Sequence, residues 1–284
     1  MTSERGLHRI HFTATAEIRM GPDGLDLVLA HGGRHPDLPR EQTLPATWRE
    51  RIEWPDGTVT AGVSEPSTLW YIETPTQRIV VDSGLSAANV AFANEVFQRR
   101  QLHQHYVHLP DSSVERFLAA HGTRPEEIDL VVLTHLHLDH FPNAPAFTRA
   151  RFLVHVRELA AGLAPAPHDG FHWREFAPYL LQVIDRVEIV HGDMQIEPGI
   201  EVWHVGGHSQ GQLAVVVQTR AGTVVLGSDF FSTYKSIELS WPPGIYTNLD
   251  EWESNARRLR RVADVIVPGH DWSVWERHPD QVIG

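Results

Sequence analysis

Short apolar runs that end in polar clusters make up most of the middle of the chain. Stretches rich in Val, Ile and Leu between turn-forming residues predict β-strands. The predicted strands are 68–73, 78–82, 130–133, 151–156, 187–190, 200–205, 213–219, 223–226 and 265–267. Helices are expected between blocks of these strands, which favours an α/β protein with two sheets sandwiched between helical layers.

Three segments are predicted to be helical. The first spans 112–121, with Asp111 or Ser112 as its N-terminal cap and Gly122 closing it, and the second spans 175–184. The third, 249–262, is amphipathic and follows Asn248, a residue type that commonly caps helices.

The length of 284 residues suits one large domain, and we expect residues 1–284 to form it. Residues 1 to about 65 match no familiar module, and the stretch 21–66 contains many prolines and glycines. We expect this N-terminal elaboration to cover a pocket or to supply the contact of a homodimer.

Composition narrows the available chemistry. The chain has no cysteine and a single lysine, Lys235, which excludes thiolate metal sites and most lysine-based Schiff-base mechanisms. A formal net charge of −12 opposes binding to nucleic acid. No apolar run is long enough to cross a membrane and no secretory signal is visible, so we expect a soluble, cytoplasmic protein acting on a small molecule.

Histidine is the residue in excess, with 19 in the chain. Five predicted strands end in polar clusters, and loops at strand ends are where sites are commonly built. These clusters are Asp82, the segment 135–140, the Gly206-Gly207-His208 loop, Asp229, and the Gly269-His270 pair. We expect them to converge on one rim of the sandwich.

The sequence THLHLDH at 134–140 packs four candidate metal ligands into a short stretch. Side chains alternate along an extended segment, so His135 and His137 can bind one ion, and Asp139 continues that face. Pro142 cannot continue the hydrogen bonding of a β-strand, so a turn is expected there. The turn would direct His140 towards the position of a second ion. Two neighbouring ions are therefore expected.

Each ion would need about three protein ligands. His208 and His270 supply further imidazoles, and Asp229 can bridge both ions with its two carboxylate oxygens. The alternative is that the histidines cap strand ends, which explains any one of them but not the spacing in 135–140. Other histidines lie in polar surroundings and are expected at the solvated surface: His8, His11, His31, His35, His103, His105, His108, His121, His168, His172 and His278.

The chain resembles the metallo-β-lactamase superfamily of hydrolases, and within it most the N-acyl homoserine lactonase group. The resemblance rests on THLHLDH at 134–140, GGHSQGQ at 206–212, GSD at 227–229 and PGHD at 268–271, after VVDSG at 80–84. It implies an αββα sandwich of two mixed β-sheets flanked by helices. It also implies two Zn²⁺ ions, or Fe, Mn or Co in their place, and hydrolysis by a metal-bound hydroxide.

The resemblance further implies roles for individual residues. The ligand set would be His135, His137 and His208 for one metal, Asp139, His140 and His270 for the other, and Asp229 as the bridge. Asp139 would also carry a proton from the attacking water to the leaving alkoxide. Asp82 would orient a ligand histidine or a loop amide.

One position departs from the lactonase pattern. Relatives place a tyrosine that binds the carbonyl three residues after the bridging aspartate, where this chain has Ser232. The nearest tyrosine, Tyr234, is the candidate for that catalytic role, and an ordinary amphipathic loop residue is the alternative. The segment 230–246 is a candidate wall of the substrate pocket.

These observations predict a metal-dependent hydrolase that opens a lactone or related ester, with quorum quenching as the role that the resemblance implies. The alternatives are hydrolysis of a thioester, as in glyoxalase-type enzymes, hydrolysis of a β-lactam, or a mononuclear iron sulfur dioxygenase.

Overall fold

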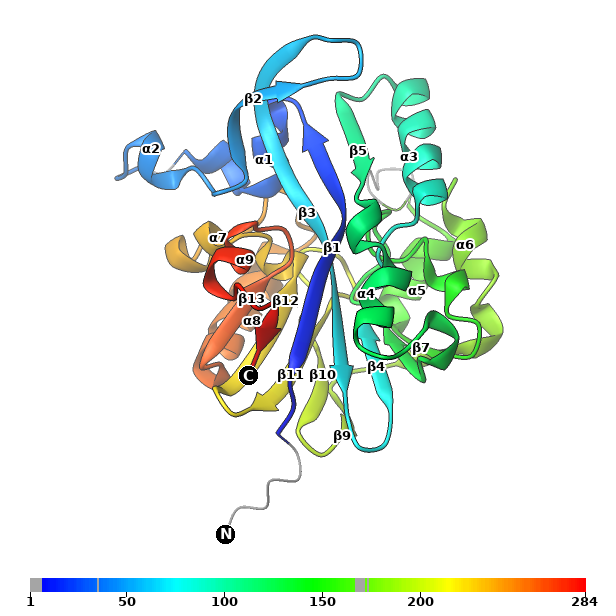
Figure 1. Ribbon diagram of the computed structural model, residues 1–284. Coiled ribbons are helices and arrows are strands. Elements are labelled where there is room, and N and C mark those ends of the chain that lie inside the picture. Colours follow the sequence, from blue (N-terminus) through cyan, green and yellow to red (C-terminus); the bar gives the residue numbers. More distant parts are fainter. Residues whose placement is uncertain (1–6, 35, 167–171, 173) are drawn as a thin grey trace.

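Two β-sheets packed face to face form the centre of the molecule (Figure 1). The computed structural model describes residues 7–34, 36–166, 172 and 174–284. The larger sheet follows the order β14 (Val282–Ile283), β1 (Ile10–Met20), β3 (Val59–Glu73), β4 (Arg78–Val81), β6 (Leu130–Val132), β7 (Arg151–His155) and β8 (Val187–Val190), with β2 (Trp48–Glu53) beside β3 and β5 (Gln104–His108) beside β1.

The smaller sheet follows the order β13 (Val265–Pro268), β12 (Gly222–Ser228), β11 (Leu213–Thr219), β10 (Ile200–His204) and β9 (Met194–Glu197). Both sheets are mixed. In the larger one β4, β6, β7 and β8 run parallel, and in the smaller one β12 and β13 do, while the other pairs are antiparallel.

Helices cover the outer faces of both sheets (Figure 1). Side chains of the two sheets, Trp70 and Val215 among them, form the apolar layer between the sheets. On the outer face of the larger sheet, α3 (Ala87–Arg100) and α4 (Val114–Ala120) pack on buried strand residues. On the smaller sheet, α8 (Leu249–Val262) packs through Trp252. The predicted αββα sandwich is confirmed.

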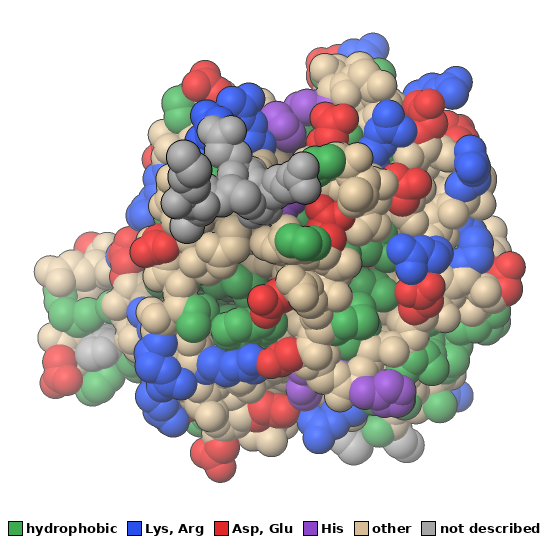
Figure 2. All heavy atoms as spheres, turned by 90° about the horizontal axis from the view of Figure 1, so that it is seen from below, with side chains coloured by type: hydrophobic (Ala, Val, Ile, Leu, Met, Phe, Trp, Pro, Cys, Tyr) green, Lys and Arg blue, Asp and Glu red, His purple; other side chains and the backbone are tan. Residues whose placement is uncertain are grey.

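The remaining α-helices of the described chain are short. They are α1 (Leu25–Val28), α2 (Arg40–Thr43), α5 (Val156–Leu163), α6 (Ala177–Leu181), α7 (Tyr234–Leu239) and α9 (Ser273–Arg277). Each helix in the described residues is too short or too polar to cross a lipid bilayer. On the face shown in Figure 2, Lys and Arg side chains are interspersed with Asp and Glu.

All nine predicted strands are present, and the predicted helix 249–262 matches α8. Asn248 caps it, since its Oδ1 accepts a hydrogen bond from Glu251 N at 3.0 Å. The other two helices are shorter than predicted. The helix predicted from 112 begins later and is capped by Ser113, because the Ser112 hydroxyl instead donates to the Ala14 carbonyl at 2.6 Å. Pro178 fits only the first turn of a helix, so α6 covers less than 175–184.

The N-terminal stretch contributes to the larger sheet itself. β1 pairs with β3 from Ile10 opposite Ile72 to Met20 opposite Val63, with a shift in register between Ala14 and Ala16. Two histidines predicted at the surface are buried: His8 bonds to the Pro198 carbonyl, and His172 pairs with a carboxylate described below. His35 and His168 lie outside the described residues.

Candidate metal centre

The predicted ligands come together at one rim of the sandwich, where strands of both sheets end. β6 leads to the histidine-rich segment, the loop between β10 and β11 carries His208, and Asp229 and His270 follow β12 and β13. Within the segment, the chain turns earlier than expected, because His140 N donates to His137 O at 3.1 Å. Asp139 therefore lies in a turn with His140 and does not continue the face of His135 and His137.

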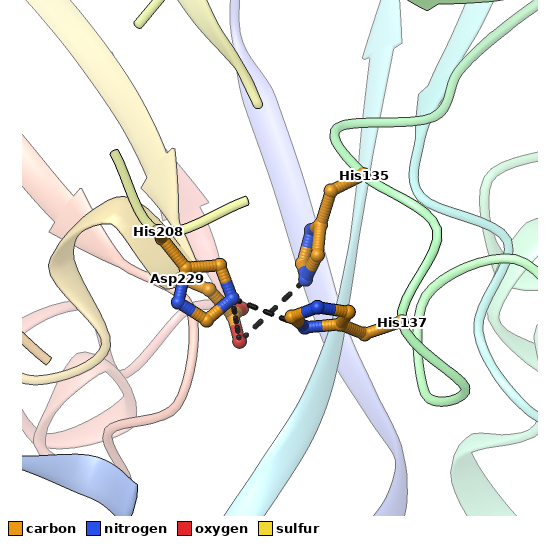
Figure 3. Close-up of side chains that lie close together, drawn as sticks. All are labelled: His135, His137, His208 and Asp229. Atoms are coloured by element: carbon orange, nitrogen blue, oxygen red, sulfur yellow. Dashed lines mark hydrogen bonds and ion pairs between the residues drawn. The ribbon is translucent and has the colours of Figure 1, made fainter. Parts of the chain in front are cut away.

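Four side chains form the first ligand group: His135, His137, His208 and Asp229 point toward one another (Figure 3). Their candidate ligand atoms all lie within 4.8 Å of one another. Asp229 Oδ2 is 3.7 Å from His135 Nε2 and 3.5 Å from His208 Nε2. His208 Nε2 is also 3.1 Å from His137 Nδ1.

Asp139, His140 and His270 form the second group, with the same 4.8 Å limit. Asp139 Oδ2 is 3.3 Å from His140 Nε2 and 3.5 Å from His270 Nε2. The other oxygen of Asp229, Oδ1, lies 3.1 Å from His140 Nε2 and 2.8 Å from His270 Nε2. Asp229 thus turns one oxygen to each group, which is the arrangement that a bridging ligand requires.

The residues fit a pair of metal ions. A tetrahedral ion with Zn–N distances of about 2.0–2.1 Å separates its ligand atoms by roughly 3.3 Å, close to the spacings in the first group. His135 Nε2 is buried and has no hydrogen-bond partner among the described residues. Burial, together with neighbouring His140, lowers the pKa of His135 well below its usual value, so the ring is neutral and can offer its lone pair.

The second group is more strongly charged. Burial disfavours a charged His140, but the carboxylates of Asp139 and Asp229 raise its pKa well above the usual value. In the same way Asp229 and Glu65 overcome burial and raise the pKa of His270 to about 10. Without a cation, protons on these imidazoles balance the carboxylates, and a divalent ion would take their place.

The outer nitrogen of each of three ligand rings is held by a second partner. The contacts are His140 Nδ1 with Asp82 Oδ2 at 2.9 Å, His208 Nδ1 with the Ile245 carbonyl at 2.8 Å, and His270 Nδ1 with the Pro66 carbonyl at 2.8 Å. Such contacts fix the tautomer and direct Nε2 at the ion. Asp82 also accepts from Thr134 N at 2.8 Å, so it joins the loop to the ring.

Backbone strain collects at the same rim. Asp82 and Ser228 have positive φ angles of 60° and 46°, a region that residues other than glycine rarely adopt. The Asp82 amide donates to Val132 O at 2.8 Å, which holds this conformation. Next to His208, Gly207 has φ 83°, and a Cβ there would lie 2.8 Å from the Trp252 Cα, so only glycine fits.

A buried carboxylate from α5 ties the two loops of the first group together. Glu158 is fully buried and accepts hydrogen bonds from Leu136 N at 2.8 Å and Gly211 N at 2.9 Å. Ser209 Oγ at 2.8 Å and His172 Nε2 at 2.7 Å complete the set. Burial opposes ionisation, but the His172 contact, the Leu136 amide and the Ser209 hydroxyl lower the pKa of Glu158. No local pattern of residues indicates this clamp, because its donors come from distant parts of the chain.

A cavity opens beside the ligands. Its apolar wall consists of Ile18, Met20, Leu27, Val28, Leu138 and Ile245. Its polar lining, apart from the ligands, consists of Glu65, Gln104, Tyr106 and Ser232. β1 and α1 supply four of the apolar residues, so the N-terminal stretch contributes one wall. The predicted wall 230–246 contributes Ser232 and Ile245.

The two tyrosines near the site differ in placement. Tyr234 does not line the cavity: its side chain packs in the layer between the sheets, and the Arg277 Cζ atom lies 3.6 Å from its ring centroid. Tyr106, which the sequence did not single out, does line it. Burial, reinforced by Asp139 and Glu65, raises the pKa of Tyr106 well above its usual value. Its hydroxyl therefore stays protonated and can donate a hydrogen bond.

A family model described as the metallo-beta-lactamase superfamily matches residues 64–270, a span that holds every candidate ligand. The chain belongs to the metallo-beta-lactamase superfamily. It is 26% identical over 219 residues to the N-acyl homoserine lactonase of Bacillus thuringiensis subsp. kurstaki, covering 72% of this chain and 81% of that protein. It is 34% identical over 155 residues to metallo-beta-lactamase domain-containing protein 1 of Homo sapiens, covering 54% of this chain and 51% of that protein.

Solved structures of two lactone-hydrolysing enzymes share the fold. An N-acyl homoserine lactone hydrolase with the product N-hexanoyl-L-homoserine at its catalytic metal center aligns with a TM-score of 0.71, at 19% identity and 96% coverage of both chains. The dizinc quorum-quenching lactonase AidC aligns with a TM-score of 0.63, at 13% identity, covering 95% of this chain and 90% of that one. The prediction of a metallo-β-lactamase-type, metal-dependent hydrolase is confirmed.

Proposed function

We propose that this chain is a dinuclear metallo-hydrolase that opens the ring of a small-molecule lactone. The observation that carries the proposal is the sharing of Asp229 between two ligand groups beside an apolar cavity. Imidazole and carboxylate donors suit Zn²⁺, and Fe, Mn or Co can use the same set. Two ligand groups favour this function over a mononuclear iron dioxygenase.

The chemistry divides between the ions and the side chains around them. Bound divalent cations would supply a water of lowered pKa and would polarise the ester carbonyl. The Asp139 carboxylate, which lines the cavity, would accept the proton that the attacking water releases. It would return this proton to the ring oxygen as the bond between that oxygen and the carbonyl carbon breaks. The Tyr106 hydroxyl would donate to the carbonyl oxygen, the role that the sequence assigned to Tyr234.

The relatives support the substrate class. Relatives that align over most of this chain are named N-acyl homoserine lactonases. By this name, their substrates are lactones that carry an acyl chain. The apolar wall from β1 and α1 suits such a chain, because burying methylene groups stabilises binding by about 0.8 kcal/mol each. Quorum quenching is the role that this substrate class indicates.

Chelation and metal restoration test the proposal. The purified protein should contain about two divalent ions per chain by elemental analysis, lose lactone hydrolysis on chelation and regain it with Zn²⁺. The His137→Ala variant should bind less metal and lose turnover. Absence of chelator-sensitive turnover on any lactone, ester or thioester would reject the proposal, and full activity of His137→Ala would reject the ligand set on which it rests.

A further inference from the structure

Glu65 is a buried acid on the cavity wall that no step of the proposed reaction uses. It lies on β3 and is 7% exposed. Its Oε2 atom is buried and has no hydrogen-bond partner among the described residues, and its Oε1 is 3.9 Å from His270 Nδ1. Burying a carboxyl oxygen without a partner costs about 1–3 kcal/mol, and an apolar residue at this position would avoid that cost. A ligand that donates a hydrogen bond to the oxygen would offset it.

Glu65 does not hold the ligand histidine beside it. His270 Nδ1 already donates to the Pro66 carbonyl at 2.8 Å, which satisfies the only proton on that nitrogen of a neutral ring. Neither ligand group includes Glu65. Its cross-strand partner on β1 is Ile18, a member of the apolar wall, so the carboxyl lies where that wall meets the charged ligand groups.

We propose that Glu65 accepts a hydrogen bond from a substrate N–H adjacent to the scissile ester, so that the site prefers lactones with an α-acylamino group. This inference rests on the proposed function. In such a lactone the N–H is separated from the reacting carbonyl carbon by a single ring carbon, so a carbonyl placed at the ligands leaves the N–H within reach of the cavity lining, which includes Glu65. A carboxyl offers an acceptor oxygen in either protonation state. A cationic donor is disfavoured because the neighbouring ligand groups would hold divalent cations.

Two matched substrates test this role. One is an α-acylamino-γ-butyrolactone, and the other carries the same acyl chain through an ester oxygen in place of the N–H. Ring opening is followed by NMR, which separates it from cleavage of the side-chain ester. We expect the wild-type protein to favour the first substrate about tenfold in kcat/KM, the effect of one hydrogen bond to a buried polar group.

Variants of Glu65 then assign that preference. Glu65→Leu should lose about tenfold in kcat/KM on the N–H substrate and less than twofold on the oxygen analogue, with unchanged metal content. Glu65→Gln keeps an acceptor oxygen and should retain most of the preference. Where the leucine variant does not fold, Glu65→Met, which is closer in length, replaces it. Equal losses on both substrates, or no loss on either, would overturn the proposal.

Calorimetry separates failure of this inference from failure of the proposed function. The ring-opened acylamino acid and its acyloxy analogue are titrated into wild-type and Glu65→Leu protein. The contact is supported if the wild type binds the acylamino acid more tightly than the acyloxy acid and the Glu65→Leu protein does not. If neither lactone is turned over, that absence of turnover rejects only the proposed reaction. Equal binding of both acids by both proteins counts against Glu65 whatever the turnover.

Discussion

At the scale of single residues, the ligands and one residue that supports them, Asp82, could be predicted, and the rest of their surroundings could not. The motif at 134–140 is local, so its spacing alone pointed to metal binding, and the structure groups its members with His208, Asp229 and His270. The pocket residues Glu65 and Tyr106 reach the site from strands that are distant in sequence, and neither carries a local signal. The tyrosine chosen by sequence, Tyr234, does not line the cavity, because nearness to Asp229 along the chain did not place its ring there.

A pair of tyrosine variants tests this difference. Tyr106→Phe should lower kcat/KM for lactone opening by about ten- to a hundredfold, because it removes the donor proposed to bind the carbonyl oxygen, where negative charge develops. Tyr234→Phe, the matched control, should change kcat/KM by less than twofold. Both variants should keep the wild-type metal content. The reverse order of effects in steady-state kinetics would restore Tyr234 to the catalytic role.

At the scale of elements, strongly patterned segments were predicted and weakly patterned ones were missed. α8 has a clear apolar face and an Asn cap, and it was found with its boundaries. α3 was missed because Ala93 and Asn89 occupy part of its buried face and weaken the contrast. β1 was missed because its alternation is interrupted at the register shift between Ala14 and Ala16. α5 matters for the site, since its Glu158 clamps the two ligand loops.

Removal of this clamp should weaken the fold. In Glu158→Gln the side-chain NH2 replaces one carboxylate oxygen, so at least one backbone N–H loses its acceptor. We therefore expect a loss of about 2–3 kcal/mol in the free energy of unfolding at pH 7. The pKa of Glu158 is lower in the folded state, so its contribution is complete above the unfolded value of about 4.3 and is lost as pH falls through the folded value. The difference between wild type and variant, measured by urea unfolding, should therefore shrink below about pH 4.

The matched control for the clamp is Glu188→Gln. Glu188 forms an exposed pair with Arg151, with 49% and 53% of the side chains accessible. Such pairs contribute about 0–1 kcal/mol, so this variant should unfold like the wild type. A Glu158→Gln effect that is equally small, or that does not depend on pH, would contradict the role of the carboxylate as a clamp.

At the scale of the whole molecule, the metal centre joins the two sheets. His135 follows β6 of the larger sheet and Asp229 follows β12 of the smaller one, so ions held by both would link the layers. Four carboxyl groups gather at the same rim, in a chain whose formal net charge is −12. These carboxyl groups are Asp82, Asp139, Asp229 and Glu65. Cations at this rim would offset both the local and the overall excess of negative charge.

Metal removal should therefore lower thermal stability as well as activity. Ions that bind only the folded state stabilise it by about 4 kcal/mol at a thousand times their dissociation constant. For a chain of this size that corresponds to a fall in Tm of about 10 °C on chelation, measurable by scanning calorimetry. Zn²⁺ should restore Tm and Mg²⁺ should not, because Mg²⁺ prefers oxygen ligands and this site is rich in imidazole. In Asp229→Asn the fall in Tm on chelation should be much smaller, because asparagine lacks the two carboxylate oxygens that would bridge the ions. If chelation abolishes activity but leaves Tm unchanged, the ions serve catalysis alone. Protein contacts such as the Glu158 clamp would then stabilise the rim.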